Sequence, residues 1–314
     1  MMTNSYDNIV TTAYHGQTLE QLLEAPVDAL KGVSAADADH LKDAFGIVSI
    51  GDLGRSIFLR RAASMVRAAV LNHDSGPPLG WSEFFATAPI DYYVNHPAGR
   101  FRLDFGPVYY RGRLDGSARV IVVGQDPSTN EILAHRIFVG QSGQRVQRVL
   151  EKLGITRSYI MLNTFLFSVF GQFFDGLEPI SEEPIIEGYR NAFLDRIIAE
   201  NEIEAVIAFG AGAQHAAVRW SNAANFPVFH LMHPAATEAN VIANWNQHLP
   251  DIRAVVTPDD DGSADTNPFG ATFAPEDLTP IPAFDLPFGV PDWHGQNGGH
   301  SNRNGNKEIV WHAP

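Results

Sequence analysis

The chain of 314 residues contains no cysteine. This absence excludes disulfide bonds, zinc sites built on thiolates and iron–sulfur clusters held by cysteine. His230 and His233 have the spacing of metal ligands, but two ligands without an obvious third make a poor metal site. We therefore expect no metal and no cofactor.

Long apolar runs are also missing. No stretch is long enough to span a bilayer, and residues 1–14 lack the basic and then apolar order of a secretory signal. These absences predict a cytoplasmic protein with no membrane partner, and we expect a monomer. A hydrophobic content of 45% is nevertheless ample for a sizeable core.

Positive charge is scarce, because the formal net charge is −14. Taken alone, this charge argues against a nucleic-acid partner. Half of it lies in residues 251–314, which carry 10 acidic and 3 basic side chains, whereas residues 101–250 carry 15 and 12. The middle segment contains a group of five bases: Arg136, Arg145, Arg148, Lys152 and Arg157. This group is explained equally well as a patch that contacts phosphates and as the solvated face of a helix.

The two ends of the chain differ from its middle. Residues 1–100 are expected to form a mainly helical extension packed on the core, with one helix running from Ser34 and Asp37 through Lys42 and another over 60–71. Residues 257–314 form an acidic tail rich in Pro, Gly and Asn. This composition predicts irregular structure that lies over the domain or is partly disordered, and two tryptophans suggest that some of it docks: Trp293 and Trp311.

The middle segment, 101–256, alternates strands and helices. Within 101–118, two short alternating runs predict extended edge structure. Apolar runs then predict strands at 119–123, 159–163, 204–209 and 227–231. Helices are expected at 142–153 with Ser142 as N-cap and Gly154 as stop, at 182–200 with Ser181 as cap, and at 211–220. The order predicts an α/β fold, a three-layer α/β/α sandwich with a central four-stranded parallel sheet.

Polar residues follow each predicted strand at its carboxyl end, where open α/β sheets bind ligands. Gln125 and Asp126 follow the first strand, and Asn163 ends the second. The third is followed by residues 210–214 (GAGAQ), and the fourth by His233. Singly, these are ordinary turn, core or capping residues. Together they predict an active site at one edge of the sheet.

The order of these motifs resembles the uracil-DNA glycosylase superfamily over about residues 100–250. The motifs that carry the resemblance are Gly124-Gln125-Asp126-Pro127, Ala134-His135 with Phe138, Leu162-Asn163, Phe209-Gly210 with Ala213-Gln214, and His233-Pro234. Residues 136–144 (RIFVGQSGQ) are similar to a branch that holds an iron–sulfur cluster on four cysteines. Because this chain has no cysteine, the resemblance implies an outlying member without that cluster.

The resemblance implies a monofunctional uracil-DNA glycosylase of base-excision repair, which hydrolyses the N-glycosidic bond of a flipped deoxyuridine. Uracil-containing DNA is then the partner and abasic DNA the product. Asp126 would orient the attacking water and stabilise the positive sugar, and His233 would donate a hydrogen bond to uracil O2. Gln125 would contact the base, Phe138 would stack on it, and Asn163 would read its edge.

The resemblance further implies DNA contacts from Pro127, Arg136, Pro234, Ala235 and Thr237. Two positions depart from the family. Thr237 stands near the place of a leucine wedge. By the resemblance, Ser128 would be part of the substrate site, where it stands in place of a tyrosine that blocks the 5-methyl group of thymine. Thr129, Asn130 and Phe165 are candidates to close the pocket instead.

Other functions remain open at this point. The altered wedge loop favours, as an alternative, a superfamily member that binds abasic or damaged DNA with little turnover. A nucleoside hydrolase could use the same pocket. A Rossmann-type oxidoreductase is the weakest alternative, because the Gly210-x-Gly212 motif lacks a third glycine. The acidic tail could cover a basic groove and compete with DNA.

Overall fold

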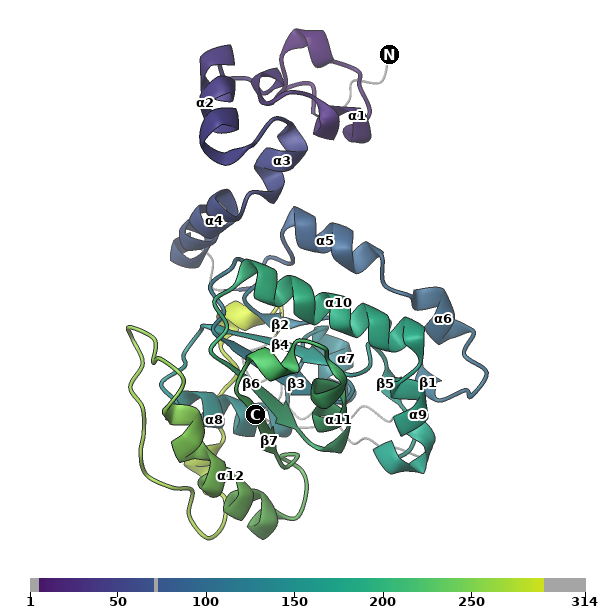
Figure 1. The fold of residues 1–314 in the computed structure, drawn as a ribbon, viewed down its shortest axis with the longest axis vertical. Helices are drawn as coiled ribbons and strands as arrows, with labels where there is room; N and C mark the ends of the chain where they lie inside the picture. Colours follow the sequence, from purple (N-terminus) through teal and green to yellow (C-terminus); the bar gives the residue numbers. More distant parts are fainter. Residues whose placement is uncertain (1–5, 71–72, 291–314) are drawn as a thin grey trace. The chain divides into compact units, whose positions relative to one another are not determined.

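A computed structural model of the protein describes residues 6–70 and 73–290 (Figure 1). The chain forms two compact units. The first comprises the described residues up to Ala69 together with Pro77–Phe84, and the second comprises the described residues of 70–76 and those from Phe85 onward. The two tryptophans expected to dock the tail, Trp293 and Trp311, lie outside the described residues.

Short helices make up the N-terminal part of the chain, as the sequence predicts. They are α1 (Leu19–Glu24), α2 (Ala35–Phe45), α3 (Ile50–Arg55), α4 (Ile57–Val70), α5 (Leu79–Ala86) and α6 (Ile90–Val94). The predicted start of α2 is confirmed: Ser34 Oγ accepts from the Asp37 N–H at 3.1 Å, and the Asp37 carboxylate accepts from the Ser34 N–H at 3.0 Å. This reciprocal cap satisfies two N–H groups that have no partner inside the helix.

A five-stranded sheet with the order β2-β4-β3-β6-β7 forms the centre of the second unit. Its strands are β2 (Arg111–Gly112), β3 (Val120–Gly124), β4 (Tyr159–Asn163), β6 (Ala205–Phe209) and β7 (Val228–Leu231). The four predicted strands are confirmed and run parallel. The predicted number of four is wrong, because the two-residue β2 adds an antiparallel edge on β4. Two residues give no periodicity that would identify a strand.

Two further two-residue strands, β1 (Phe101–Arg102) and β5 (Ser168–Val169), pair antiparallel in a small separate sheet. The extended structure expected within 101–118 is therefore divided between two sheets. The position of β5 is important for the site, because it follows directly on the segment after Asn163.

Helices pack on both faces of the central sheet. The helices that follow β3 in the chain are α7 (Thr129–Ala134), α8 (Gln141–Lys152), α9 (Glu178–Ser181), α10 (Pro184–Glu200), α11 (Ala211–Arg219) and α12 (Glu238–Arg253). Leu150 of α8 and Trp245 of α12 belong to one buried cluster with Val120 and Val122 of β3. Helix α10 lies on the opposite side of the sheet (Figure 1).

The helix ends agree with the sequence in part. Gly154, predicted as the stop of α8, has φ +75°, a left-handed conformation that glycine adopts without strain. The predicted caps Ser142 and Ser181 are wrong. Gly140 is the N-cap of α8. Helix α10 starts instead at Pro184, because a proline lacks the N–H that a first-turn residue leaves unpaired.

The tail segment, defined here as residues 257–290, pairs its acids with bases of the domain. Asp259 binds Arg119, Asp265 binds Lys152 at 2.8 Å, and Asp277 lies 3.7 Å from Arg148. Much of the basic cluster expected as a phosphate patch is thus neutralised by the chain itself.

The depressed pKa of Asp259 predicts how acid affects stability. Burial alone would raise the pKa of this carboxyl. Hydrogen bonds from Arg157 N–H, Ser158 and Thr156 N–H together have the larger, opposite effect, and they lower the pKa to about 2. A carboxyl with a lowered folded-state pKa stabilises the fold above its unfolded value of 3.8, and this contribution disappears as the pH falls toward 2. In urea unfolding between pH 5 and pH 2, we expect a smaller loss of stability for Asp259→Asn than for the wild type. Equal losses in both would contradict this prediction.

Candidate active site

The carboxyl edge of the sheet brings together a glycine, an amide and an aromatic ring. Gly124 and Asn163 end neighbouring parallel strands in register. A Cβ at Gly124 would lie 2.3 Å from Asn163 Oδ1 and 3.0 Å from the Phe138 ring. A side chain at position 124 would therefore have to displace the Asn163 amide and press on the Phe138 ring, which glycine avoids.

Phe138 is held in an unusual conformation. Its φ of +53° lies in the left-handed region, which is strained for a bulky residue. A Cβ at Gly143 would lie 1.7 Å from the Phe138 carbonyl oxygen, so the first turn of α8 closes tightly on this backbone. The Phe138 ring makes an edge contact with Phe209 at 5.9 Å between centroids. The strain is typical of a functional position.

Asn163 presents an amide that is nearly enclosed, since only 7% of the residue is exposed. No group in the described part of the chain forms a hydrogen bond with this side chain. Its amide atoms are not among the fully buried polar atoms that lack a partner in the described residues, so they open toward solvent. A ligand that displaces water from them must replace its hydrogen bonds, because an unpaired buried donor or acceptor costs about 1–3 kcal/mol. The arrangement therefore suits a ligand that brings both a donor and an acceptor.

Asp126 is half-buried and follows β3 by two residues, and two hydrogen bonds orient its carboxylate. Oδ1 accepts from Gln125 Nε2 at 3.0 Å, and Oδ2 accepts from the Val169 N–H of β5 at 3.1 Å. A Cβ at Gly212 would lie 2.6 Å from Gln125 Cγ, so the start of α11 in turn fixes the Gln125 side chain. The carboxylate is therefore held in one orientation at the sheet edge.

His233 follows β7 at the same edge. Its Nδ1 accepts from the Ala235 N–H at 3.1 Å, which leaves Nε2 as the protonated nitrogen of the neutral ring. A Cβ at Gly210, the N-cap of α11, would lie 3.0 Å from His233 Cβ. The structure thus places Asp126, Asn163 and His233 at one edge of the sheet, where the sequence predicts an active site.

A family model confirms the resemblance. Residues 112–252 match the model of the uracil DNA glycosylase superfamily. This domain belongs to that superfamily. No curated protein matches the chain. Membership makes the domain a DNA glycosylase in general terms, a hydrolase of DNA repair that binds DNA.

The loop after Asp126 builds the start of α7 in the glycosylase domain. Pro127 is buried, and Ser128 is the N-cap of α7, with its N–H donating to Glu131 at 3.1 Å. Thr129 is buried as well. The remaining candidates for closing the pocket are Asn130, which lies against Gly140, and Phe165, which is fully buried.

The residues expected to contact DNA fall into two groups. Ala235 and Thr237 are exposed on the loop between β7 and α12, whereas Pro234 is buried. Arg136 is 8% exposed, donates to Asp74 at 2.8 Å and stacks over Tyr110. Because its charge is already paired in the interior, the structure gives Arg136 a packing role and offers no support for the predicted DNA contact.

In the described part of the chain, three side chains of the kind that bind metals lie within 4.8 Å of one another: Glu178, Glu182 and His215. His215 Nε2 lies 2.9 Å from Glu182, and Arg219 lies 3.3 Å from the same carboxylate. The group thus forms an ion-pair network within the glycosylase domain. In the described residues, no helix is both long and apolar enough to cross a membrane.

Proposed function

We propose that the protein is a monofunctional uracil-DNA glycosylase, which hydrolyses the N-glycosidic bond of a flipped deoxyuridine and leaves an abasic site. The observation that carries this proposal is the largely buried Asn163, whose amide has no hydrogen-bond partner among the described residues and which lies, like the Phe138 ring, against Gly124. A uracil stacked on the ring would bring N3–H and O4 to this amide, which offers an acceptor and a donor. Cytosine presents the opposite pattern and would leave buried groups unpaired.

Asp126 acts on the sugar. As the bond between C1′ and the base N1 breaks, its electron pair goes to the base and positive charge develops on the sugar. A nearby carboxylate stabilises this charge and orients the water that attacks C1′. The two hydrogen bonds from Gln125 and Val169 hold the carboxylate in place during this step.

His233 acts on the departing base. Its neutral ring carries the proton on Nε2, because Nδ1 accepts from Ala235. Nε2–H can donate to uracil O2 as negative charge develops there, without a change of protonation state. A donor that is already oriented stabilises the transition state without further reorganisation.

A release assay tests the proposal. Oligonucleotides that contain uracil, thymine or hypoxanthine, single-stranded and opposite different partners, are incubated with the protein and then treated with alkali to cut abasic sites. We expect cleavage at uracil. If folded protein produces no scission at uracil, the proposal is wrong.

A second candidate function is binding of abasic DNA with little turnover. It is favoured by the exposed loop of Ala235, Ala236 and Thr237, which offers no large apolar side chain to fill a vacated base stack. Tight binding of abasic DNA together with negligible uracil release would support this function.

Replacing the histidine is expected to slow base release without unfolding the protein. His233→Ala removes one oriented donor, and such a loss costs on the order of 10²–10³ in rate. Single-turnover release of uracil measures it. His135→Asn is the matched control, because His135 is exposed, its φ is +50°, and asparagine tolerates this conformation. Wild-type rates in His233→Ala would overturn the role of this residue.

A further inference from the structure

The tail segment reaches the loop that carries His233, although it lies beyond the matched domain. Phe269 and Phe273 each pack against Trp245 of α12 at 5.6 Å between ring centroids. Asn246 of the same helix fixes the tail further, because its side chain exchanges two hydrogen bonds with the Phe269 backbone, at 2.8 and 3.0 Å. The tail is thus fastened to α12 beside the candidate active site.

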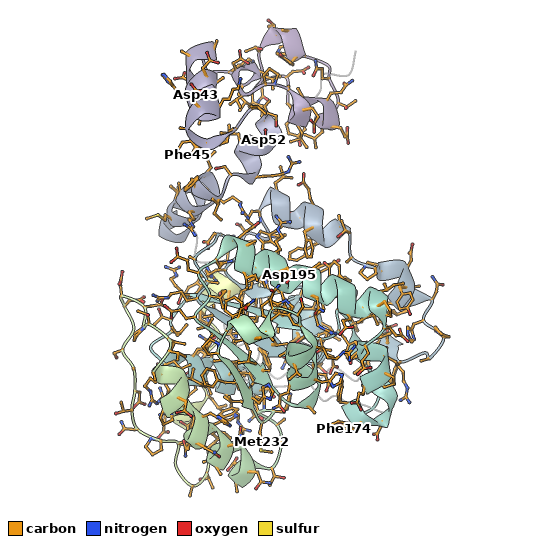
Figure 2. All side chains as sticks on the ribbon, viewed as in Figure 1. Asp43, Phe45, Asp52, Phe174, Asp195 and Met232 are labelled. Carbon is orange, nitrogen blue, oxygen red and sulfur yellow. The ribbon has the colours of Figure 1, made fainter. Side chains whose placement is uncertain are left out.

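Helix α12 in turn holds the residue before His233. Trp245 Nε1 donates to the Met232 carbonyl at 2.9 Å, and the Met232 N–H donates to Asn244 Oδ1 at 2.7 Å. Figure 2 labels Met232, which lies where β7 leaves the sheet. The aromatic cluster of the tail therefore contacts the side chain that anchors one end of the His233 loop.

Arg145 of α8 holds the other end of this loop. Its guanidinium donates to the Pro234 carbonyl at 2.7 Å and lies 4.2 Å from the centre of the Phe273 ring. Glu238 closes the arrangement, since it lies 3.6 Å from Arg145 and accepts from the Phe273 N–H at 3.3 Å. The Arg145 side chain is only 15% exposed, so these contacts are partly shielded from water.

Each of these contacts acts on the loop backbone next to His233. A catalytic group that moves by about 1 Å can lose on the order of 10² in rate. Side chains that lock a loop in the productive geometry prevent such a loss. Arg145 is suited to this task, because its planar guanidinium can donate to a carbonyl and stack on an aromatic ring at the same time.

We propose that the tail is a positioning element of the glycosylase site: Phe273 holds Arg145, and Arg145 holds the Pro234 carbonyl, so that His233 is fixed against the base. Arg145 and Phe273 are positioning residues in this arrangement, and neither contacts the substrate. The inference rests on the proposed function for its catalytic consequence, but the geometry of the loop can be tested without activity.

The kinetic test uses the full-length protein and a uracil-containing oligonucleotide. We expect Arg145→Ala and Phe273→Ala to lower kcat by about 10- to 100-fold, with KM within about threefold of wild type. Arg145→Lys should give an intermediate kcat, because lysine keeps a donor for the Pro234 carbonyl but loses the planar stack. An unchanged kcat in Arg145→Ala would overturn the proposal.

Arg148→Ala is the matched control. Arg148 lies on the same helix and also pairs with the tail, at Asp265 and Asp277, and its ion pairs and hydrogen bonds within the described residues do not involve the His233 loop. Its kcat should stay within about twofold of wild type. If Arg145→Ala instead raises KM and makes its salt dependence shallower, Arg145 is a phosphate contact and the proposal is wrong.

Hydrogen exchange separates this inference from the proposed function. We expect faster exchange of the Ala235 and Ala236 amides in Arg145→Ala than in the wild type, because their N–H groups donate to His233 within the loop, whereas Arg148→Ala should leave them unchanged. Unchanged exchange in Arg145→Ala overturns the positioning role. Faster exchange in a protein whose wild type releases no uracil keeps the positioning role and refutes only the proposed function.

Discussion

Asp285→Ala is expected to lose about 3–5 kcal/mol of unfolding free energy, because it removes one partner of a buried ion pair. Asp285 and Arg111 are both fully buried, and Arg111 donates to Asp285 at 3.0 Å. Arg113 and the Tyr159 hydroxyl donate to the same carboxylate. Without it, two guanidinium groups and a hydroxyl would be left without their main acceptor inside the protein.

A loss of this size is a large part of the 5–15 kcal/mol that stabilises a typical domain. Urea unfolding followed by circular dichroism measures it. Asp260→Ala is the matched control, because it removes an equal charge from an exposed position of the same tail segment and should change stability by less than about 0.5 kcal/mol. If Asp285→Ala unfolds within about 1 kcal/mol of wild type, the buried pair does not stabilise the fold as described.

Asp126→Asn is expected to lower the rate of uracil release by on the order of 10³-fold while the fold is retained. The amide keeps the size of the carboxyl but loses the negative charge that stabilises the sugar and the second acceptor that orients the water. An amide also offers only one acceptor to the two donors at this position, Gln125 Nε2 and the Val169 N–H. Because the site is half-buried, the effect on stability should be small.

Single-turnover release with uracil oligonucleotides measures this effect, with thermal unfolding as the check on the fold. Asp175→Asn is the control for loss of a carboxylate charge, because Asp175 is exposed in the short helical segment Phe173–Leu177 that follows β5. Its rate should stay within about twofold of wild type. Release by Asp126→Asn at more than a tenth of the wild-type rate would argue against a catalytic carboxylate at this position.

Three of the four parallel strands were predictable from the sequence as buried, mainly apolar runs, whereas β7 is half-buried over its first three residues. Every residue of β3, β4 and β6 is buried, and such runs identify strands of a parallel sheet. Helix α12 was not predicted. Its signal is weak, because Pro250 interrupts the pattern near its C-terminal end and the segment carries many polar residues.

The residues of the candidate site were predictable because they follow the ends of predicted strands, but the groups that form hydrogen bonds with them were not. The sequence places Asp126 after β3, yet only the structure shows the Val169 N–H that binds it, 43 residues away. The basic cluster illustrates the same limit. Lys152 is paired with Asp265, 113 residues later, so its neighbourhood in the sequence gives no indication of its partner.

The buried pair of Arg111 and Asp285 has a consequence for how the protein is made. The two residues are 174 positions apart, so at about 5–20 residues per second a ribosome needs roughly 9–35 s to add the acceptor after the donor. During this interval, the edge strand that carries Arg111 has no counter-ion with which to enter the core. The sheet is therefore expected to complete its folding late in translation or after it. Until then, the nascent chain needs protection from aggregation.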